Sequence, residues 1–163
     1  MIERTLILVK PDGVRRGLIG EVLKRFEQRG LKIIGLKLVW IDDKFAKKHY
    51  TEDIGKKHGE KMWKRLLGYI KEGPVVAAVL EGVNAVENVR KICGSTYPHE
   101  ALPGTIRGDY AHISKHYANE NERNVMNIIH ASGDKKDADR EVKLWFSDSE
   151  LFEYKLSHEN ELR

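Results

Sequence analysis

The sequence predicts an α+β fold in which helices pack on a four-stranded antiparallel sheet. Four short apolar runs have the length and composition of strands, and helical patterns lie between them in two β-α-β halves. No repeat or linker divides the 163 residues, which indicates a single domain over 1–163. Two split β-α-β halves predict a ferredoxin-like βαββαβ sandwich, with its helices on one face of the sheet.

The first half of the chain holds two strands and the helices that accompany them. Mostly apolar runs indicate the strands. Apolar residues at helical spacing, followed by Gly30, indicate the first long helix. The elements expected here are a central strand over 4–10, a turn at Pro11–Gly13, a helix over 18–26, a strand over 31–40, and helices near 43–50 and 60–71.

The second half repeats the pattern with a long interruption. Residues 94–124 are rich in Gly, Pro, Asn, His and Tyr, and so long a connection is typically functional or mobile. The elements expected are a strand over 74–80, a helix over 85–93 capped by Asn84 and Glu87, a strand over 125–130, a helix capped by Asp134, and a capping box of Ser147 with Glu150.

Composition narrows the class of protein. The net charge of +4 suits a polyanionic partner but does not choose among nucleotide, nucleic acid and acidic lipid. The single cysteine, Cys93, fits a buried packing role in a reducing compartment. The N-terminus runs directly into a strand pattern, and no apolar run could cross a bilayer. We therefore expect a cytoplasmic protein without membrane contact.

Several common phosphate and metal motifs are missing from the sequence. It has no Gly-x-x-x-x-Gly-Lys-Ser/Thr, no Gly-x-Gly-x-x-Gly, no Cys-x-x-Cys and no His-Glu-x-x-His. A protein of this kind that handles phosphates must do so with side chains instead of a glycine-rich loop.

His130 is the first candidate for chemistry. It ends a short apolar run and is followed by Ala131–Gly133 and a helix start, so its ring should be rigidly held near the positive end of a helix. Imidazole titrates near neutrality and is a competent nucleophile for phosphoryl transfer. The alternative is a histidine satisfied beneath a loop.

Three basic residues form the second candidate group. Lys10 ends the first strand, and Arg107 stands in Pro103–Asp109 with a glycine near it on each side. Together with Arg90 they could stabilise the charge that phosphoryl transfer gathers on oxygen. The alternative is ordinary solvated charge among 29 Lys and Arg residues.

Three motifs in order closely resemble the signatures of nucleoside diphosphate kinases: Lys10–Val14, Pro103–Asp109 and Asn127–Ser132. The resemblance extends through Arg16–Glu21, Gly73–Val76 and Glu141–Phe146, and covers roughly residues 3–154. It implies the same sandwich fold and a ping-pong reaction, in which the γ-phosphoryl of a nucleoside triphosphate such as ATP passes through a histidine to a nucleoside diphosphate.

The resemblance also implies roles for individual residues. His130 matches the histidine that carries the phosphoryl group. Matching positions give Lys10 at the transferring phosphate; Arg90, Thr96 and Arg107 at the β- and γ-phosphates; Asn127 at the ribose; Tyr50 and Ser132 near the histidine; and Glu141 as the carboxylate that orients it. Mg²⁺ would be bound mainly through the nucleotide phosphates, without a protein metal site. A homo-hexamer is implied, or alternatively a tetramer.

The sequence departs from the family pattern at 51–63. A short Arg-Pro-Phe-Phe-like segment is expected after Tyr50, but the stretch is longer here and lacks that proline and the phenylalanine pair. Trp63 or Met62 could stack on the base, although Trp63 also fits the buried face of a helix. Lys56 or Lys57 could replace the arginine, as a point charge without its bidentate fork.

A second departure is an insertion within 110–126. Its histidines, His112 and His116, could ligate a metal if the segment were helical, but a solvated loop is the better interpretation. The insertion could change subunit contacts or cover the site.

The alternative function is a non-catalytic module of the same fold that binds nucleotide or RNA. RNA binding would require exposed rings on the central strands, and neither 4–10 nor 74–80 contains one. We therefore expect no specific nucleic-acid partner. A chain that had lost its activity should also have lost His130, Lys10 or Arg107, and all three are present.

Overall fold

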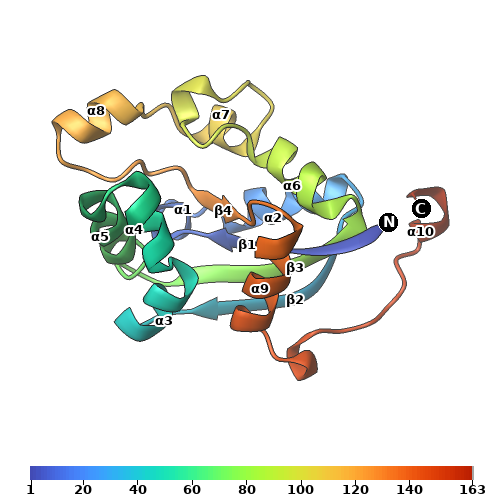
Figure 1. The fold of residues 1–163 in the computed structure, drawn as a ribbon. Helices are drawn as coiled ribbons and strands as arrows, with labels where there is room; N and C mark the ends of the chain where they lie inside the picture. The colour runs from blue at the N-terminus through green and yellow to red at the C-terminus, as the bar shows by residue number, and fades with distance from the viewer. Residues whose placement is uncertain (163) are drawn as a thin grey trace.

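A four-stranded antiparallel sheet forms the centre of the computed structural model, which describes residues 1–162 (Figure 1). The strands are β1 (Ile2–Val9), β2 (Lys32–Val39), β3 (Val75–Val83) and β4 (Ile129–Ala131), in the spatial order β2-β3-β1-β4. Every neighbouring pair is antiparallel. This confirms the α+β fold with a ferredoxin-like sheet. Arg163, the last residue of the expected domain, lies outside the described residues.

Helices make up most of the rest of the chain. They are α1 (Pro11–Arg15), α2 (Ile19–Gln28), α3 (Asp43–His49), α4 (Glu52–His58), α5 (Glu60–Tyr69), α6 (Ala85–Cys93), α7 (Ile106–Tyr110), α8 (Lys115–Glu120), α9 (Lys135–Trp145) and α10 (Glu159–Leu162), with 3₁₀ turns at Pro98–Glu100 and Asp148–Glu150. Within residues 1–162, none of these helices is long and apolar enough to span a membrane.

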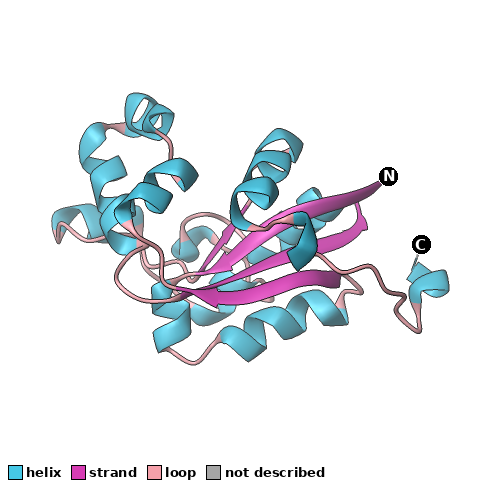
Figure 2. Cartoon of the chain, turned by 90° about the horizontal axis from the view of Figure 1, so that it is seen from below, coloured by secondary structure: helices cyan, strands magenta, loops and turns pink. Residues whose placement is uncertain are grey.

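The helices cover both faces of the sheet, so the expectation that they lie on one face is wrong. Alternate residues of β1 point to opposite sides, and Leu8 and Val9 belong to two separate apolar cores. One core contains side chains of α3, α5 and α9, and the other contains those of α2 and α6. The helices above and below the strands are visible in Figure 2. The near-continuous apolar runs of β1 and β3 reflect this burial on both faces.

The residues after β1 form a helix where a simple turn was expected. Lys10 has extended backbone angles and occupies the N-cap position of α1, with Pro11 as the first helical residue. Proline is favoured there because its fixed φ suits a helix and its missing N–H would have no intrahelical partner. The short helix therefore begins directly at the end of the central strand.

The last strand is shorter than expected. Residues 125–130 were predicted as a strand, but β4 covers only Ile129–Ala131. The cause is Ile128, whose φ of 70° lies in the left-handed region and is incompatible with a strand.

Two of three predicted helix caps are confirmed. The side chain of Asp134 accepts a hydrogen bond from the backbone of Asp137, and the capping box of Ser147 is complete, although it heads only a 3₁₀ turn. Asn84 is not a side-chain cap: its backbone is left-handed, and the carboxylate of Glu3 accepts from the Val86 N–H at the start of α6. A residue distant in sequence supplies this cap.

The two unusual segments lie at one end of the sheet. Residues 51–63 contain α4 and the beginning of α5, while α8 forms within 110–126. Figure 1 shows α4 and α5 on one side of this end, and α7 and α8 above it. The Lys61 ammonium of α5 contacts the carboxylate of Glu122, just beyond α8, at 2.6 Å. The segments are therefore joined at the surface.

Candidate active site

His130 lies in the middle of β4, directly opposite Leu8 of β1. Because paired residues share a face, its ring stands on the side of the sheet that α3 and α9 cover. Its neighbour Ile129 is fully buried, but the His130 side chain is 18% exposed. The sheet fixes the ring while leaving it open to a ligand.

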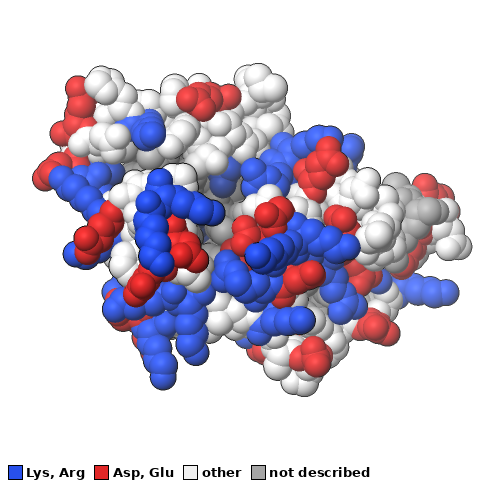
Figure 3. All heavy atoms as spheres, in the orientation of Figure 1, with Lys and Arg blue, Asp and Glu red and all other residues white. Residues whose placement is uncertain are grey.

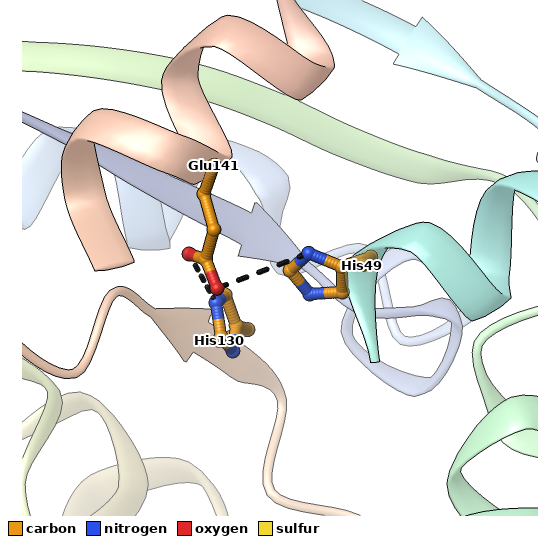
Figure 4. Close-up of side chains that lie close together, drawn as sticks. All are labelled: His49, His130 and Glu141. Atoms are coloured by element: carbon orange, nitrogen blue, oxygen red, sulfur yellow. Dashed lines mark hydrogen bonds and ion pairs between the residues drawn. The ribbon is translucent and has the colours of Figure 1, made fainter. Parts of the chain in front are cut away.

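Glu141 of α9 reaches down to this ring (Figure 4). Its Oε2 atom lies 2.9 Å from Nε2 of His130 and also accepts a 2.8 Å hydrogen bond from the Ser132 hydroxyl. Arg140 donates to the other carboxylate oxygen at 3.2 Å. Burial alone would raise the pKa of Glu141, but the charge and hydrogen bond of His130, with smaller contributions from His49 and Ser132, lower it to about 2. The carboxylate stays ionised.

The contact with Glu141 distinguishes the two ring nitrogens of His130. An ionised carboxylate only accepts hydrogen bonds, so Nε2 must carry a proton. In the neutral ring, Nδ1 then has the free lone pair, and it points away from Glu141 (Figure 4). Since His130 lines the adjacent cavity, the arrangement exposes a nucleophilic nitrogen and stabilises the cation that forms when it reacts.

His49, at the end of α3, is a neighbour that the sequence did not single out. Its ring lies 4.6 Å from that of His130, and its Nδ1 atom accepts a 3.2 Å hydrogen bond from the Trp145 indole. It is 1% exposed, and burial, followed by the charge of His130, lowers its pKa well below the usual value. His49 is thus a neutral ring packed against His130. His49 ends a short helix that contains Lys44, Lys47 and Lys48, and the sequence of this polar helix gives no sign that its histidine is buried.

His49, His130 and Glu141 form a cluster whose ligand atoms lie within 4.8 Å of one another. These residues already have hydrogen-bond partners in the protein: the Trp145 indole donates to Nδ1 of His49, and Nε2 of His130 is bonded to Glu141. A metal ion would have to displace both bonds from a nearly closed site. The other predicted possibility, His112 with His116, is not realised either, since His112 precedes α8 and the two do not share a helix.

Lys10 and Asn127 form a bonded pair beside His130. The Lys10 ammonium donates to Oδ1 of Asn127 at 2.6 Å, and Nδ2 of Asn127 donates to the carbonyl of Thr96 at 2.8 Å. Both side chains are nearly buried, with exposed residue fractions of 6% and 5%. Burial, and then the charge of Arg107, lower the pKa of Lys10 to about 7. An anionic ligand would restore the preference for the charged amine.

Arg107 of α7 has backbone contacts that were not expected from the sequence, in addition to its place at the cavity. Its guanidinium donates to three backbone carbonyls: Gly94 at 2.9 Å, Asn127 at 3.3 Å and Ile129 at 2.6 Å. The fork has five donor hydrogens, so two remain for a ligand. Arg107 therefore ties the end of α6 to both sides of Ile128 and still lines the cavity.

A cavity of about 660 Å³ opens in front of these groups. Its lining contains many cations, and no Asp or Glu among the described residues contributes to it. The basic side chains are Lys10, Arg65, Arg90, Arg107, Lys115 and Arg123. Elsewhere charges of both signs alternate over the surface, as Figure 3 shows for α3, α4 and α9. A concave lining whose charged side chains are all basic suits a polyanion such as a chain of phosphates.

The cavity brings together most of the residues that the sequence singled out. Lys10, Tyr50, Arg90, Thr96, Arg107, Asn127 and His130 all line it. Tyr50 is 6% exposed, and its ring lies 6.2 Å from that of His130. Ser132 and Glu141 stand behind His130 and not in the cavity lining.

In the segment after Tyr50, neither Trp63 nor the pair Lys56 and Lys57 lies at the cavity. Trp63 is partly buried against the core beside Gly55 of α4, and its indole N–H donates to the carbonyl of Tyr50 at 2.7 Å. It does not line the cavity, whereas Met62 does. Lys56 and Lys57 are exposed outside the cavity lining, and Arg65 is the α5 cation within it. Helical spacing could have indicated Arg65, because residues three positions apart in a helix lie on the same face and Met62 faces the cavity.

The insertion forms part of the cavity wall. Lys115, Asn119, Arg123 and Val125 all line it, so the segment covers one side of the site. This is one of the two roles that the sequence left open.

Comparison with known proteins agrees with this geometry. A family model described as nucleoside diphosphate kinase matches residues 3–151. A nucleoside diphosphate kinase of Borreliella burgdorferi is 48% identical over 162 residues, covering 99% of this chain and 97% of the relative. One from Pyrococcus horikoshii is 52% identical over 153 residues, covering 93% of this chain and 90% of the relative.

Solved structures give the same match. A transition-state mimic of nucleoside-diphosphate kinase from Borrelia burgdorferi, with bound vanadate and ADP, superposes with a TM-score of 0.96 at 48% identity and covers 99% of this chain and 96% of that one. A nucleoside diphosphate kinase from Halobacterium salinarum in complex with CDP gives a TM-score of 0.85 at 37% identity, with 100% and 99% covered.

Proposed function

Because the chain belongs to the nucleoside diphosphate kinase family and is a phosphotransferase acting on nucleotides, we propose that Nδ1 of His130 carries the phosphoryl group. The observation that supports this most directly is the contact of Nε2 with the ionised Glu141, which places the proton of the neutral ring on Nε2 and leaves Nδ1 as the nitrogen with the free lone pair beside the cavity. The alternative of a non-catalytic RNA-binding module is not retained, since helices pack on both faces of the sheet.

The reaction has two half-steps that use the same atoms. In the first, the Nδ1 lone pair forms a bond to the γ-phosphorus of a nucleoside triphosphate such as ATP, the bond to the β,γ-bridging oxygen breaks, and the nucleoside diphosphate leaves. In the second, a terminal oxygen of another nucleoside diphosphate attacks the phosphohistidine and the N–P bond breaks. Glu141 and Ser132 hold the ring throughout, and the proton on Nε2 never has to move.

The cationic lining supports a specific placement of the nucleotide. We assign the β- and γ-phosphates to Arg90, Thr96, Arg107 and Lys10, and the ribose to Asn127 and Lys10, which are already hydrogen-bonded to each other. Tyr50 packs beside the histidine. Met62, with Leu66, offers the base an apolar surface without base-specific donors. Trp63 has a structural role in this assignment, through its core packing and its hydrogen bond to the carbonyl of Tyr50. Such a surface is compatible with a broad range of bases.

Mg²⁺ enters this scheme as part of the substrate. The described cavity lining has no carboxylate, and hard divalent cations prefer oxygen ligands, so the nucleotide phosphates would hold the ion. The protein would bind the complex through its cations and the phosphate oxygens that Mg²⁺ leaves free. We infer no resident metal site.

The decisive experiment is phosphorylation of the pure protein by γ-labelled ATP with Mg²⁺. We expect an acid-labile, base-stable label that GDP removes, and no label on His130→Gln although it still binds ADP. His116→Gln is a matched control because His116 is exposed on α8 outside the cavity, and it should label like the wild type. A label that persists on His130→Gln would contradict the assignment.

We also propose a homo-hexamer, or alternatively a tetramer, built from dimers that meet at β2. This strand is at the edge of the sheet; Leu36 and Leu38 in its second half and Trp40 just beyond it are 53%, 62% and 68% exposed. Exposed apolar side chains at alternate positions of an open edge strand are typical of an interface. Sedimentation should give a multiple of the chain mass and a smaller species for Leu38→Lys; a monomeric wild type would overturn the proposal.

A cytoplasmic location is inferred from the one cysteine, Cys93, which is buried and unpaired. Subcellular fractionation would test it, and recovery of the protein outside the cytoplasm would contradict it.

A further inference from the structure

The backbone between Asn127 and His130 has an unusual conformation. Ile128 has a φ of 70°, and the N–H of Ile129 donates to the carbonyl of Asn127 at 2.7 Å. A hydrogen bond across three residues with a positive φ at the centre defines the strained form of the γ-turn, which is rare. It is especially unfavourable for a β-branched residue. Strain of this kind persists only where the surrounding structure imposes it.

Two buried side chains outside the cavity hold this turn. Oδ2 of Asp12 accepts a 3.1 Å hydrogen bond from the N–H of Ile128, and the Tyr69 hydroxyl donates to Oδ1 of the same carboxylate. Asp12 is 4% exposed and Tyr69 1%. Burial, and then the negative charge of Asp12, raise the pKa of Tyr69, so its hydroxyl remains a donor. Neither residue lines the cavity.

The other contacts of the turn fix its carbonyl oxygens and leave the N–H of Ile128 to Asp12. Arg107 donates to the carbonyls of Asn127 and Ile129, and the backbone N–H of Lys10 donates to that of Ile128 at 2.7 Å. The adjoining Gly13 makes room, since a Cβ there would lie 3.0 Å from Cγ2 of Ile128. Without Asp12, the buried N–H would have no acceptor, and the strained turn would relax toward ordinary extended backbone.

The turn joins the two groups that must be aligned for transfer. Asn127, on one side, is bonded to Lys10, and His130 follows two residues after Ile128. Successive strand residues point to opposite faces, so an extended Ile128 would redirect the Asn127 side chain relative to the His130 ring. The left-handed residue allows both to face one cavity.

We propose that Asp12 and Tyr69 are positioning residues: their hydrogen-bonded pair holds the strained turn at Ile128 and so sets the angle between the His130 ring and the Lys10–Asn127 pair. The inference rests on the proposed role of His130. Phosphoryl transfer depends on in-line approach at near contact distance, so a small rotation here should slow the chemical step more than it weakens binding.

Tyr69→Phe is the sharpest test because it removes one hydroxyl and retains the ring in the core. Rapid-quench measurement of His130 phosphorylation by ATP should show a rate about 10-fold lower, with the dissociation constant for ADP within about threefold of wild type. Tyr154→Phe is the matched control: its hydroxyl also bonds a distant partner, the carbonyl of Ile33, but lies away from the site, and its rate should be unchanged.

Asp12→Asn provides a second variant. Its phosphorylation rate should fall about 10- to 100-fold, because an amide has one acceptor oxygen and cannot accept hydrogen bonds from both the Ile128 N–H and the Tyr69 hydroxyl as the carboxylate does. Equal rates in folded wild type, Tyr69→Phe and Asp12→Asn would overturn the proposal. So would losses that merely follow the fraction of unfolded protein. A wild type that takes no label on His130 would instead refute the proposed nucleophile, so the two failures are distinguishable.

Discussion

The cavity has two walls that are held in different ways. The inner wall consists of Lys10, Arg107, Asn127 and His130 at the end of the sheet, with Glu141 behind His130. Four of these are less than 10% exposed, and each is fixed by buried hydrogen bonds to backbone or to another site residue. The chemistry is therefore placed by the fold itself.

The outer wall consists of α5 and the segment 115–125. Glu122 links them through ion pairs with Lys61 at 2.6 Å and with Arg65 at 3.9 Å, and the side chains of Lys61 and Glu122 are 74% and 73% exposed. Exposed ion pairs contribute little, because water and salt screen them. Changes to the inner wall should therefore impair catalysis and stability together, whereas changes to the cavity-facing side chains of the outer wall should alter only access and binding.

The largest effect is expected for Arg107→Lys. A lysine cannot replace a fork that bonds three carbonyls, so kcat should fall about 100- to 1000-fold, and the free energy of unfolding should fall by about 2–4 kcal/mol. Steady-state kinetics and urea denaturation would measure both. Arg90→Lys is the matched control, because Arg90 is exposed in the same cavity; it should reduce activity only a few-fold and leave stability unchanged. Equal losses in both variants would contradict the importance of the three carbonyl bonds that only Arg107 makes.

Lys10 gives the next largest effect, through pH. Its pKa of about 7 in the free protein means that the amine loses its proton above that pH, whereas phosphates favour the charged form. Affinity for ADP should therefore fall by up to about tenfold per pH unit above 7, with proton uptake on binding near pH 8. Calorimetry in buffers of different ionisation enthalpy would measure the uptake. Lys10→Arg, which keeps its charge, should show none; uptake equal to that of the wild type would contradict the assignment.

Glu141→Gln should reduce the phosphorylation rate about 10- to 30-fold, because a neutral amide no longer stabilises the His130 cation. It should also change stability with a defined pH dependence. The folded pKa, lowered from 4.5 to about 2, contributes on the order of 3 kcal/mol above pH 4.5, and this is lost as the pH falls toward 2. The stability difference between wild type and Glu141→Gln should narrow over that window, as measured by denaturation at each pH. A difference that stays constant from pH 7 to 3 would exclude a charged Glu141.

Much of this inner wall was predictable from the sequence, because local signals and fold agree there. The continuous apolar runs of β1 and β3, the helix cap at Asp134, and the order of the three motifs place Lys10, Arg107 and His130 at one sheet end. What could not be predicted depends on contacts between distant residues. The γ-turn at Ile128 is imposed by Asp12, and the cap of α6 comes from Glu3.

The outer wall was predicted less well for a related reason. The helix α4 has no buried residue, and Met62 and Trp63 are adjacent in the amphipathic helix α5, so the sequence does not show which of them faces the cavity. That is why Trp63 and Met62 remained alternatives until the core contact and the cavity separated them. The burial of His49 likewise depends on Trp145, almost a hundred positions away.

Met62→Ala and Trp63→Ala compare the cavity side and the core side of α5 at adjacent residues. Met62→Ala should raise the KM for nucleotides about three- to fivefold with stability unchanged, because it removes an apolar surface at the cavity. Trp63→Ala should lower the free energy of unfolding by about 2–3 kcal/mol with KM nearly unchanged, since it removes core packing and the bond to Tyr50. The reverse pattern would indicate that Trp63, and not Met62, contacts the nucleotide base.

The smallest effect is expected for Lys61→Glu, which places like charges at the link between α5 and the insertion. Repulsion from Glu122 should separate the outer wall slightly and raise KM about twofold at low ionic strength, with kcat unchanged. At about 0.5 M salt the Debye length is only a few ångströms, and the effect should vanish. Lys64→Glu is the matched control, because Lys64 pairs with Glu60 within α5 and does not bridge the cavity. If both variants changed KM equally, net surface charge would explain the result. A change confined to Lys61→Glu would show that this exposed pair controls access to a site whose chemistry it leaves untouched.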